Sequence, residues 1–110
     1  MATAATSIEG RRAQRDIVSF RAPLDGPAGI RTTVLMVDIS PLGFMSRSSA
    51  TLAPGDVVAV KLPVVGARAA RIVWSMAGRV GGEFIECIGV DQYARMLANT
   101  PHDRPNWNEV

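Results

Sequence analysis

Residues 57–62 read VVAVKL, and this stretch decides the fold class of the chain. The large apolar residues Val58, Val60 and Leu62 occupy every second position, and Lys61 belongs to the opposite face. A period of two is typical of a β-strand that buries one face and exposes the other. The stretch therefore predicts a half-buried strand.

Similar stretches lie on both sides of this strand, and residues that favour turns separate them. We expect the other strands at residues 17–22, 30–37, 44–47, 67–75 and 79–86. The turns are expected at residues 24–29, 38–43, 53–56, 63–66 and 77–78. Strands spaced ~8–12 residues apart predict a small antiparallel barrel or sandwich. We favour a closed barrel, because closure leaves no exposed edge strand in so short a chain.

The hydrophobic period changes after the last strand. Val90, Tyr93, Ala94 and Leu97 recur at i, i+3, i+4 and i+7, which predicts one amphipathic helix over residues 90–97. We expect its apolar face to pack on one mouth or flank of the barrel. The predicted fold class is all-β with one C-terminal α-helix.

The chain of 110 residues is long enough for one domain with a real core. We expect a disordered lead-in over residues 1–8, the domain over 9–99 and a tail without periodicity over 100–110. The net charge of +2 argues against a general nucleic-acid coating protein. Eleven of the twelve basic residues are Arg, whose planar fork suits phosphate, carboxylate or guanine edges, although a GC-rich genome also favours Arg.

The cysteine and histidine content points to a cytoplasmic protein that is not an enzyme. Cys87 is the single cysteine, so we expect no disulfide and a small buried side chain. No apolar run approaches the ~20 residues that span a bilayer, and the N-terminus lacks a secretory signal pattern. His102 is the single histidine and lies in the tail, so a His-based triad or metal cluster has no basis. We expect no catalytic residue, metal or cofactor.

Two polar clusters suggest a binding site. Residues 38–43 read DISPLG, in which Asp38 and Ser40 are expected on one face while Pro41 and Gly43 favour a tight turn. Gly43 permits a backbone conformation that other residues avoid. The same residues also suit an ordinary turn with no binding role.

The second cluster is the arginine run at residues 11–15, RRAQR. Arg11 and Arg15 would share a face about 13 Å apart in an extended segment. Their forks can bind phosphate or the O6/N7 edge of guanine, and Asp38 can accept from the guanine N1–H and N2–H groups, which adenine does not offer. The pattern predicts a guanine nucleotide site; the other interpretation is a solvated basic arm.

Both clusters together resemble the motifs of the PilZ domain, the bacterial receptor module for cyclic di-GMP. Residues 11–15 match its R-x-x-x-R motif and residues 38–43 its D/N-x-S-x-x-G motif. Residues 71–74 (RIVW) and 81–84 (GGEF) resemble the closing strands of the family, so the resemblance covers about residues 9–97.

The resemblance implies a six-stranded antiparallel PilZ-type β-barrel with a flexible N-terminal arm that wraps cyclic di-GMP against it. The arginines would hold phosphate and guanine groups, Asp38 and Ser40 would hydrogen-bond a guanine, and Gly43 would let the backbone approach. The implied ligand-binding residues are Arg11, Arg12, Arg15, Asp38, Ser40, Gly43 and Trp74. Gly10, which precedes the motif, leaves open whether one or two ligand molecules bind.

Trp74 has two interpretations. It shares a face with Ala70 and Ile72 in the expected strand, so it is either a core residue or a neighbour of the ligand.

Three functions remain open. The first is a cyclic di-GMP receptor that changes its arm and surface on binding and so regulates an unidentified protein partner. The second is a PilZ-type adaptor that binds protein but no nucleotide. The third, a barrel that binds single-stranded nucleic acid, is disfavoured, because three Phe, two Trp and one Tyr offer few stacking platforms outside a core. We expect no DNA partner and no membrane insertion.

Overall fold

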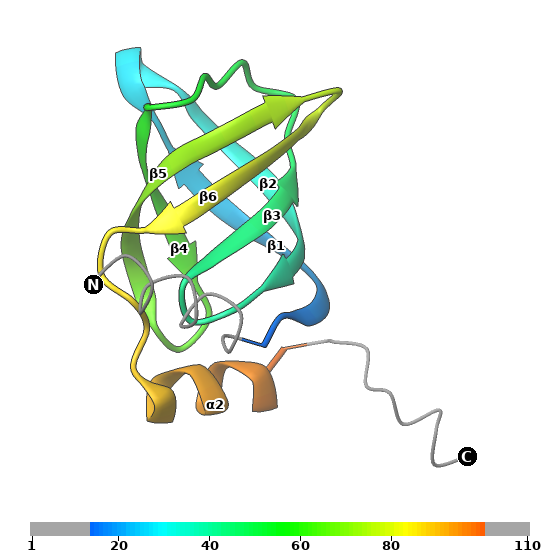
Figure 1. Ribbon diagram of the computed structural model, residues 1–110, viewed down its shortest axis with the longest axis vertical. Coiled ribbons are helices and arrows are strands. Elements are labelled where there is room, and N and C mark those ends of the chain that lie inside the picture. Colours follow the sequence, from blue (N-terminus) through cyan, green and yellow to red (C-terminus); the bar gives the residue numbers. More distant parts are fainter. Residues whose placement is uncertain (1–13, 101–110) are drawn as a thin grey trace, which may run out of the picture.

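Six antiparallel strands close into a barrel, and one helix follows them (Figure 1). The structure is a computed structural model that describes residues 14–100. The strands are β1 (Asp16–Asp25), β2 (Arg31–Ile39), β3 (Gly43–Arg47), β4 (Val57–Leu62), β5 (Gly66–Met76) and β6 (Arg79–Phe84), with a 3₁₀ turn η1 (Pro27–Gly29) and the helix α2 (Val90–Ala98). The prediction of a closed six-stranded barrel with one C-terminal helix is confirmed.

The barrel closes where the first strand meets the fourth. The strand order around the barrel is β1-β2-β3-β6-β5-β4, and Leu24 pairs with Val60 across the β1–β4 junction. Along β4, Val58, Val60 and Leu62 are buried while Lys61 is exposed, as their alternation predicts. Each strand thus contributes its inward residues to one core, and no strand is left as an open edge.

Several strand ends differ from expectation. The second strand runs to Ile39 rather than residue 37, so Asp38 lies in β2 and not in the predicted turn. The first strand runs to Asp25 rather than residue 22, because the short turn η1 completes the hairpin and the ladder continues up to it. The last strand ends at Phe84 rather than residue 86. Beyond it, Ile88 takes the buried position and Cys87 is exposed, so the expectation of a buried cysteine is wrong.

A β-bulge in β5 overturns the expected alternation around Trp74. Ile72 pairs with Gly82 and Trp74 with Gly81, which leaves Val73 as an extra residue in β5. A bulge re-aims the side chains that follow it. Trp74 therefore does not share the inner face with Ala70 and Ile72, but lies on the outer surface with 39% of its area exposed.

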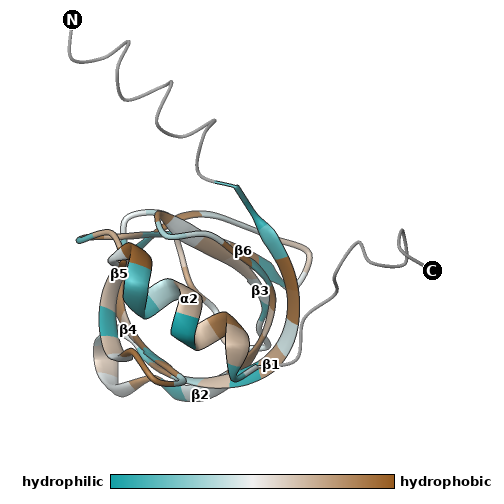
Figure 2. Cartoon of the chain, turned by 90° about the horizontal axis from the view of Figure 1, so that it is seen from below, coloured by the Kyte–Doolittle hydropathy of each residue, from teal (hydrophilic) through white to brown (hydrophobic). Residues whose placement is uncertain are grey.

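The helix α2 covers the lower opening of the barrel, as seen from below in Figure 2. The prediction of a helix at this place is confirmed, and the predicted packed face is correct for Tyr93 and Leu97 but wrong for Val90 and Ala94, which are exposed. Tyr93 and Met96 are buried and Leu97 is partly buried, whereas Val90 is 79% exposed. The packed face is centred on Tyr93, whose hydroxyl lies within hydrogen-bond distance of Asp16 and the Ile39 carbonyl, and Gln92 beside it accepts a hydrogen bond from Arg68 of β5.

Within residues 14–100, no helix combines the length and apolar character needed to cross a bilayer. The expected lead-in (1–8), the arginines Arg11 and Arg12, and the residues 101–110 of the expected tail lie outside the described residues.

Candidate functional site

The turn after β2 is held rigidly by its own serine. Ser40 is only 3% exposed, and its Oγ accepts hydrogen bonds from the backbone N–H of Leu42 (3.1 Å) and of Gly43 (3.3 Å). The backbone N–H of Ser40 in turn donates to Gly43 O (2.9 Å). The hydroxyl proton of Ser40 is still free to donate, since its oxygen is used here as an acceptor.

Gly43 is required for a reason that differs from expectation. Its φ is not in the left-handed region that favours glycine. Instead, a Cβ at this position would clash with the carbonyl oxygen of Gly82 and lie 3.3 Å from Glu83 Cα. Gly43 therefore allows β3 and β6 to approach closely beside the turn.

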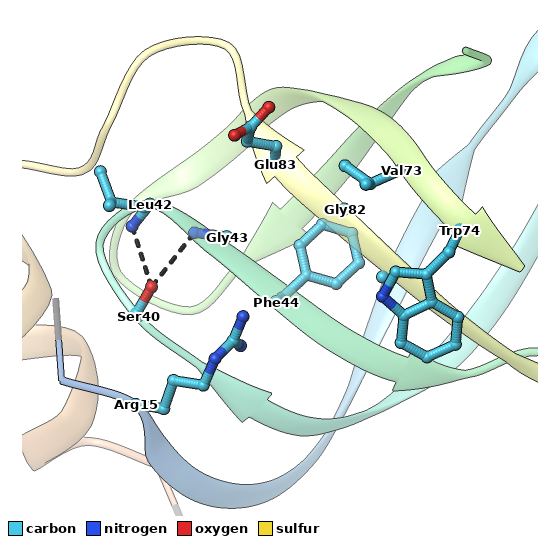
Figure 3. Close-up of a pocket in the computed structure, with 10 residues that line it drawn as sticks. Arg15, Ser40, Leu42, Gly43, Phe44, Val73, Trp74, Gly82 and Glu83 are labelled. Carbon is cyan, nitrogen blue, oxygen red and sulfur yellow. Dashed lines mark hydrogen bonds between the residues drawn. The ribbon is translucent and has the colours of Figure 1, made fainter. Parts of the chain in front are cut away.

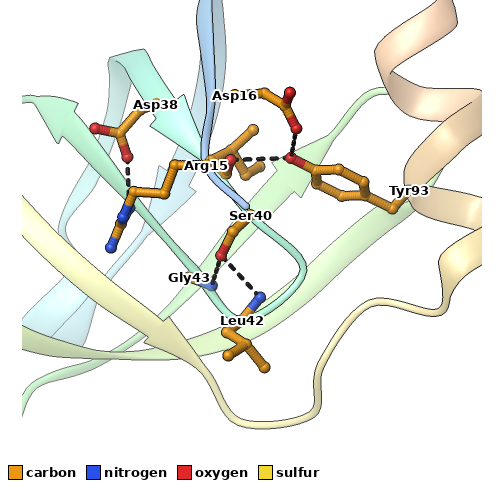
Figure 4. Close-up of polar contacts among 8 residues, drawn as sticks. Arg15, Asp16, Asp38, Ser40, Leu42, Gly43 and Tyr93 are labelled. Atoms are coloured by element: carbon orange, nitrogen blue, oxygen red, sulfur yellow. Dashed lines mark hydrogen bonds and ion pairs between the residues drawn. The ribbon is translucent and has the colours of Figure 1, made fainter. Parts of the chain in front are cut away.

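Arg15 and Asp38 bring the two predicted motifs together. Arg15 Nη1 lies 2.5 Å from Asp38 Oδ1 and donates a hydrogen bond to it (Figure 4). The Asp38 side chain is 19% exposed and that of Arg15 is 58% exposed, so the pair lies at the surface. Asp38 follows a bulge in β2, and its second carboxylate oxygen has no hydrogen-bond donor among residues 14–100.

A shallow hollow of about 260 Å³ lies beside this pair on the outer face of β3, β5 and β6 (Figure 3). Its wall residues are Arg15, Ser40, Leu42, Gly43, Phe44, Val73, Trp74, Gly81, Gly82 and Glu83. The hollow thus joins four of the predicted site residues, Arg15, Ser40, Gly43 and Trp74. Asp38 does not line it but holds Arg15 at its rim.

Two adjacent glycines shape the hollow from opposite sides of the sheet. A Cβ on Gly81 would lie 2.5 Å from Trp74 Cε2, so the missing side chain lets the indole lie against the outer face of β6. A Cβ on Gly82 would lie 2.6 Å from Phe44 Cζ, and Phe44 is buried in the barrel. The two aromatic partners come from other strands, so the local sequence carries no signal for them.

Tyr93 ties the helix to β1 and β2 next to the two ion-paired residues (Figure 4). Its Oη lies 2.6 Å from Asp16 Oδ2 and 2.9 Å from the Ile39 carbonyl oxygen, and its single proton can be donated to either acceptor. Asp16 follows Arg15 and Ile39 follows Asp38 in the chain. Burial raises the pKa of Tyr93 well above its ordinary value, and the carboxylate of Asp16 raises it further. Tyr93 therefore stays protonated and remains a donor at neutral pH.

Glu83, Val73 and Phe44 also line the hollow, although the sequence motifs did not predict them as site residues. Glu83 faces outward from β6 and pairs in register with Gly43 of β3 and with Arg71 of β5. Only the register between strands brings these residues to the hollow.

Within residues 14–100, no group of three His, Cys, Asp or Glu side chains is arranged to hold a metal ion. Comparison with known proteins found no family model that matches this chain and no curated protein with significant similarity to it.

Proposed function

We propose that this chain is a PilZ-type receptor for cyclic di-GMP. The observation that carries the proposal is the contact between Arg15 and Asp38, which are 23 positions apart and belong to the two motifs. The contact lies at the rim of a hollow that Ser40, Gly43 and Trp74 also line. Arginine, aspartate and serine side chains, which can bind guanine or phosphate, thus lie close together beside the indole of Trp74.

The geometry supports a guanine base in the hollow. The indole of Trp74 offers a flat face for stacking, since base–aromatic stacking contributes about 1–3 kcal/mol. Arg15 uses one of its five N–H donors on Asp38, so others can bind the guanine O6/N7 edge or a phosphate. The second oxygen of Asp38 can accept a hydrogen bond from the base.

The hollow is smaller than pockets that enclose a whole ligand, which measure about 300–1,000 Å³. A dinucleotide would therefore need a further cover. We assign that role to the segment that carries Arg11 and Arg12. In this proposal the protein acts in the cytoplasm without catalysis, and closure of the segment over the ligand creates a surface that a protein partner recognises.

Charge removal at the rim tests the proposal. We expect Arg15→Ala and Asp38→Ala each to weaken the binding of cyclic di-GMP about tenfold or more, because each removes hydrogen bonds to a charged group. Equilibrium dialysis with labelled ligand measures the change. The Arg15–Asp38 pair is at the surface and contributes at most about 1 kcal/mol to stability, so both variants should remain folded.

Arg31→Ala is the matched control. Arg31 is also an exposed arginine paired with an aspartate, Asp25, at 3.5 Å, but it does not line the hollow. We expect wild-type affinity in this control. Equal affinity in all three variants would contradict the assigned site. A wild-type chain that binds a protein partner but no cyclic di-GMP would instead favour the adaptor function.

A further inference from the structure

Two exposed arginines of neighbouring strands have no ion-pair partner among residues 14–100. Arg47 of β3 and Arg79 of β6 are register partners, and both are exposed. Like charges directly opposite each other in a sheet are destabilising. Among residues 14–100, the carboxylates that form ion pairs bind Arg15 and Arg31, and neither Arg47 nor Arg79 has such a partner. The barrel thus places two exposed arginines opposite each other in the sheet.

These arginines line a second hollow, which shares one wall residue with the first. It measures about 590 Å³, and its walls include Arg47, Trp74, Met76 and Arg79. Trp74 is the wall residue that the two hollows share. Met76 is largely exposed and pairs with Arg79 in register, so an apolar surface lies directly beside the two charges.

The distance between the two hollows matches a ligand with two bases. Gly43 lines the first hollow and Arg47 the second, and Arg47 lies four residues further along β3, which is about 13 Å. A single nucleobase is too short to fill both hollows. A ligand with two purines joined through phosphates can place one base on each side of Trp74.

Building on the proposed function, we infer that Arg47 and Arg79 form a second base subsite, which binds the far guanine of the dinucleotide. The flat base packs against Trp74 and Met76. Its O6 and N7 atoms accept hydrogen bonds from the arginines, which is the commonest contact of arginine with guanine. Adenine presents a donor in place of O6, so this subsite prefers guanine.

A pair of ligands separates base recognition from charge attraction. The first ligand is cyclic di-GMP, and the second is the hybrid cyclic dinucleotide with one guanine and one adenine. We expect wild type to bind cyclic di-GMP on the order of tenfold more tightly than the hybrid. In Arg47→Gln/Arg79→Gln, we expect the affinity for cyclic di-GMP to fall by a similar factor, to a value close to that of the hybrid.

Arg31→Gln/Arg95→Gln is the matched control, since it removes two exposed positive charges that line neither hollow. It should keep the wild-type preference. Unchanged binding in Arg47→Gln/Arg79→Gln would overturn the second subsite and leave the receptor function intact, as would an equal loss for both ligands. A wild-type chain that binds neither ligand would overturn the receptor function itself.

Discussion

Residues of the candidate site stabilise the barrel and also form its outer surface. Ser40 closes its turn by accepting two backbone hydrogen bonds, and Gly43 lets two strands approach. Residues 40–43 therefore form the expected tight turn, whereas Asp38 and Ile39 still belong to β2. The same turn fixes one wall of the hollow, so its structural role and its proposed binding role are compatible.

At the residue scale, the glycine pair in β6 gives a sharp prediction. We expect Gly81→Ala to lower the free energy of unfolding by about 1–3 kcal/mol, because the new methyl group displaces the Trp74 indole. Gly82→Ala should have a comparable or larger effect, because it collides with Phe44 inside the barrel. Urea denaturation measures both changes.

Gly89→Ala is the control for this pair, since no atom lies within 4 Å of a Cβ at Gly89 and its φ is −63°. Gly89 is the N-cap of α2, where Ala is a poorer residue than Gly, so we expect a loss of no more than about 1 kcal/mol. If Gly81→Ala is as stable as Gly89→Ala, the indole does not lie against β6 as described.

At the scale of elements, one hydroxyl joins the helix to the barrel. Tyr93 of α2 bonds to the start of β1 and the end of β2, next to Arg15 and Asp38. Tyr93→Phe leaves the partly buried Asp16 carboxylate and the Ile39 carbonyl without this donor. We expect it to destabilise the protein by about 1–3 kcal/mol, which urea denaturation would reveal.

The raised pKa of Tyr93 also predicts a pH dependence. The folded state keeps the proton above pH 10, where the unfolded state loses it, so the free energy of unfolding should fall as the pH rises beyond about 10. Tyr93 is the only tyrosine, so the absorbance of tyrosinate reports it alone. We expect this absorbance to appear together with unfolding. Ionisation of Tyr93 near pH 10 in the folded protein would contradict the buried hydrogen bonds.

Across the whole molecule, hydrophobic periodicity predicted the barrel. Apolar and polar residues alternate along the strands, and residues that favour turns separate one strand from the next. The periodicity missed the outward position of Trp74, since a bulge depends on how two strands pair and not on either strand alone. It placed Tyr93 and Leu97 correctly on the packed face of α2 but missed Met96 and wrongly included Val90 and Ala94, because the contacts of the helix with the barrel are not visible in its own sequence.

The candidate site could be predicted only where its residues belong to a local pattern in the sequence. Arg15, Asp38, Ser40 and Gly43 belong to short motifs that are visible in the chain. The walls formed by Glu83 and Val73, and the pairing of Arg47 with Arg79, depend on strand register. Arg11 and Arg12 lie outside the described residues, so their roles stay predictions.

The most direct test of the receptor function is a calorimetric titration of the full-length chain with cyclic di-GMP. We predict a saturable heat at micromolar protein concentration, together with its loss in Arg15→Ala. No heat of binding from the folded wild-type chain under these conditions would contradict the proposed function.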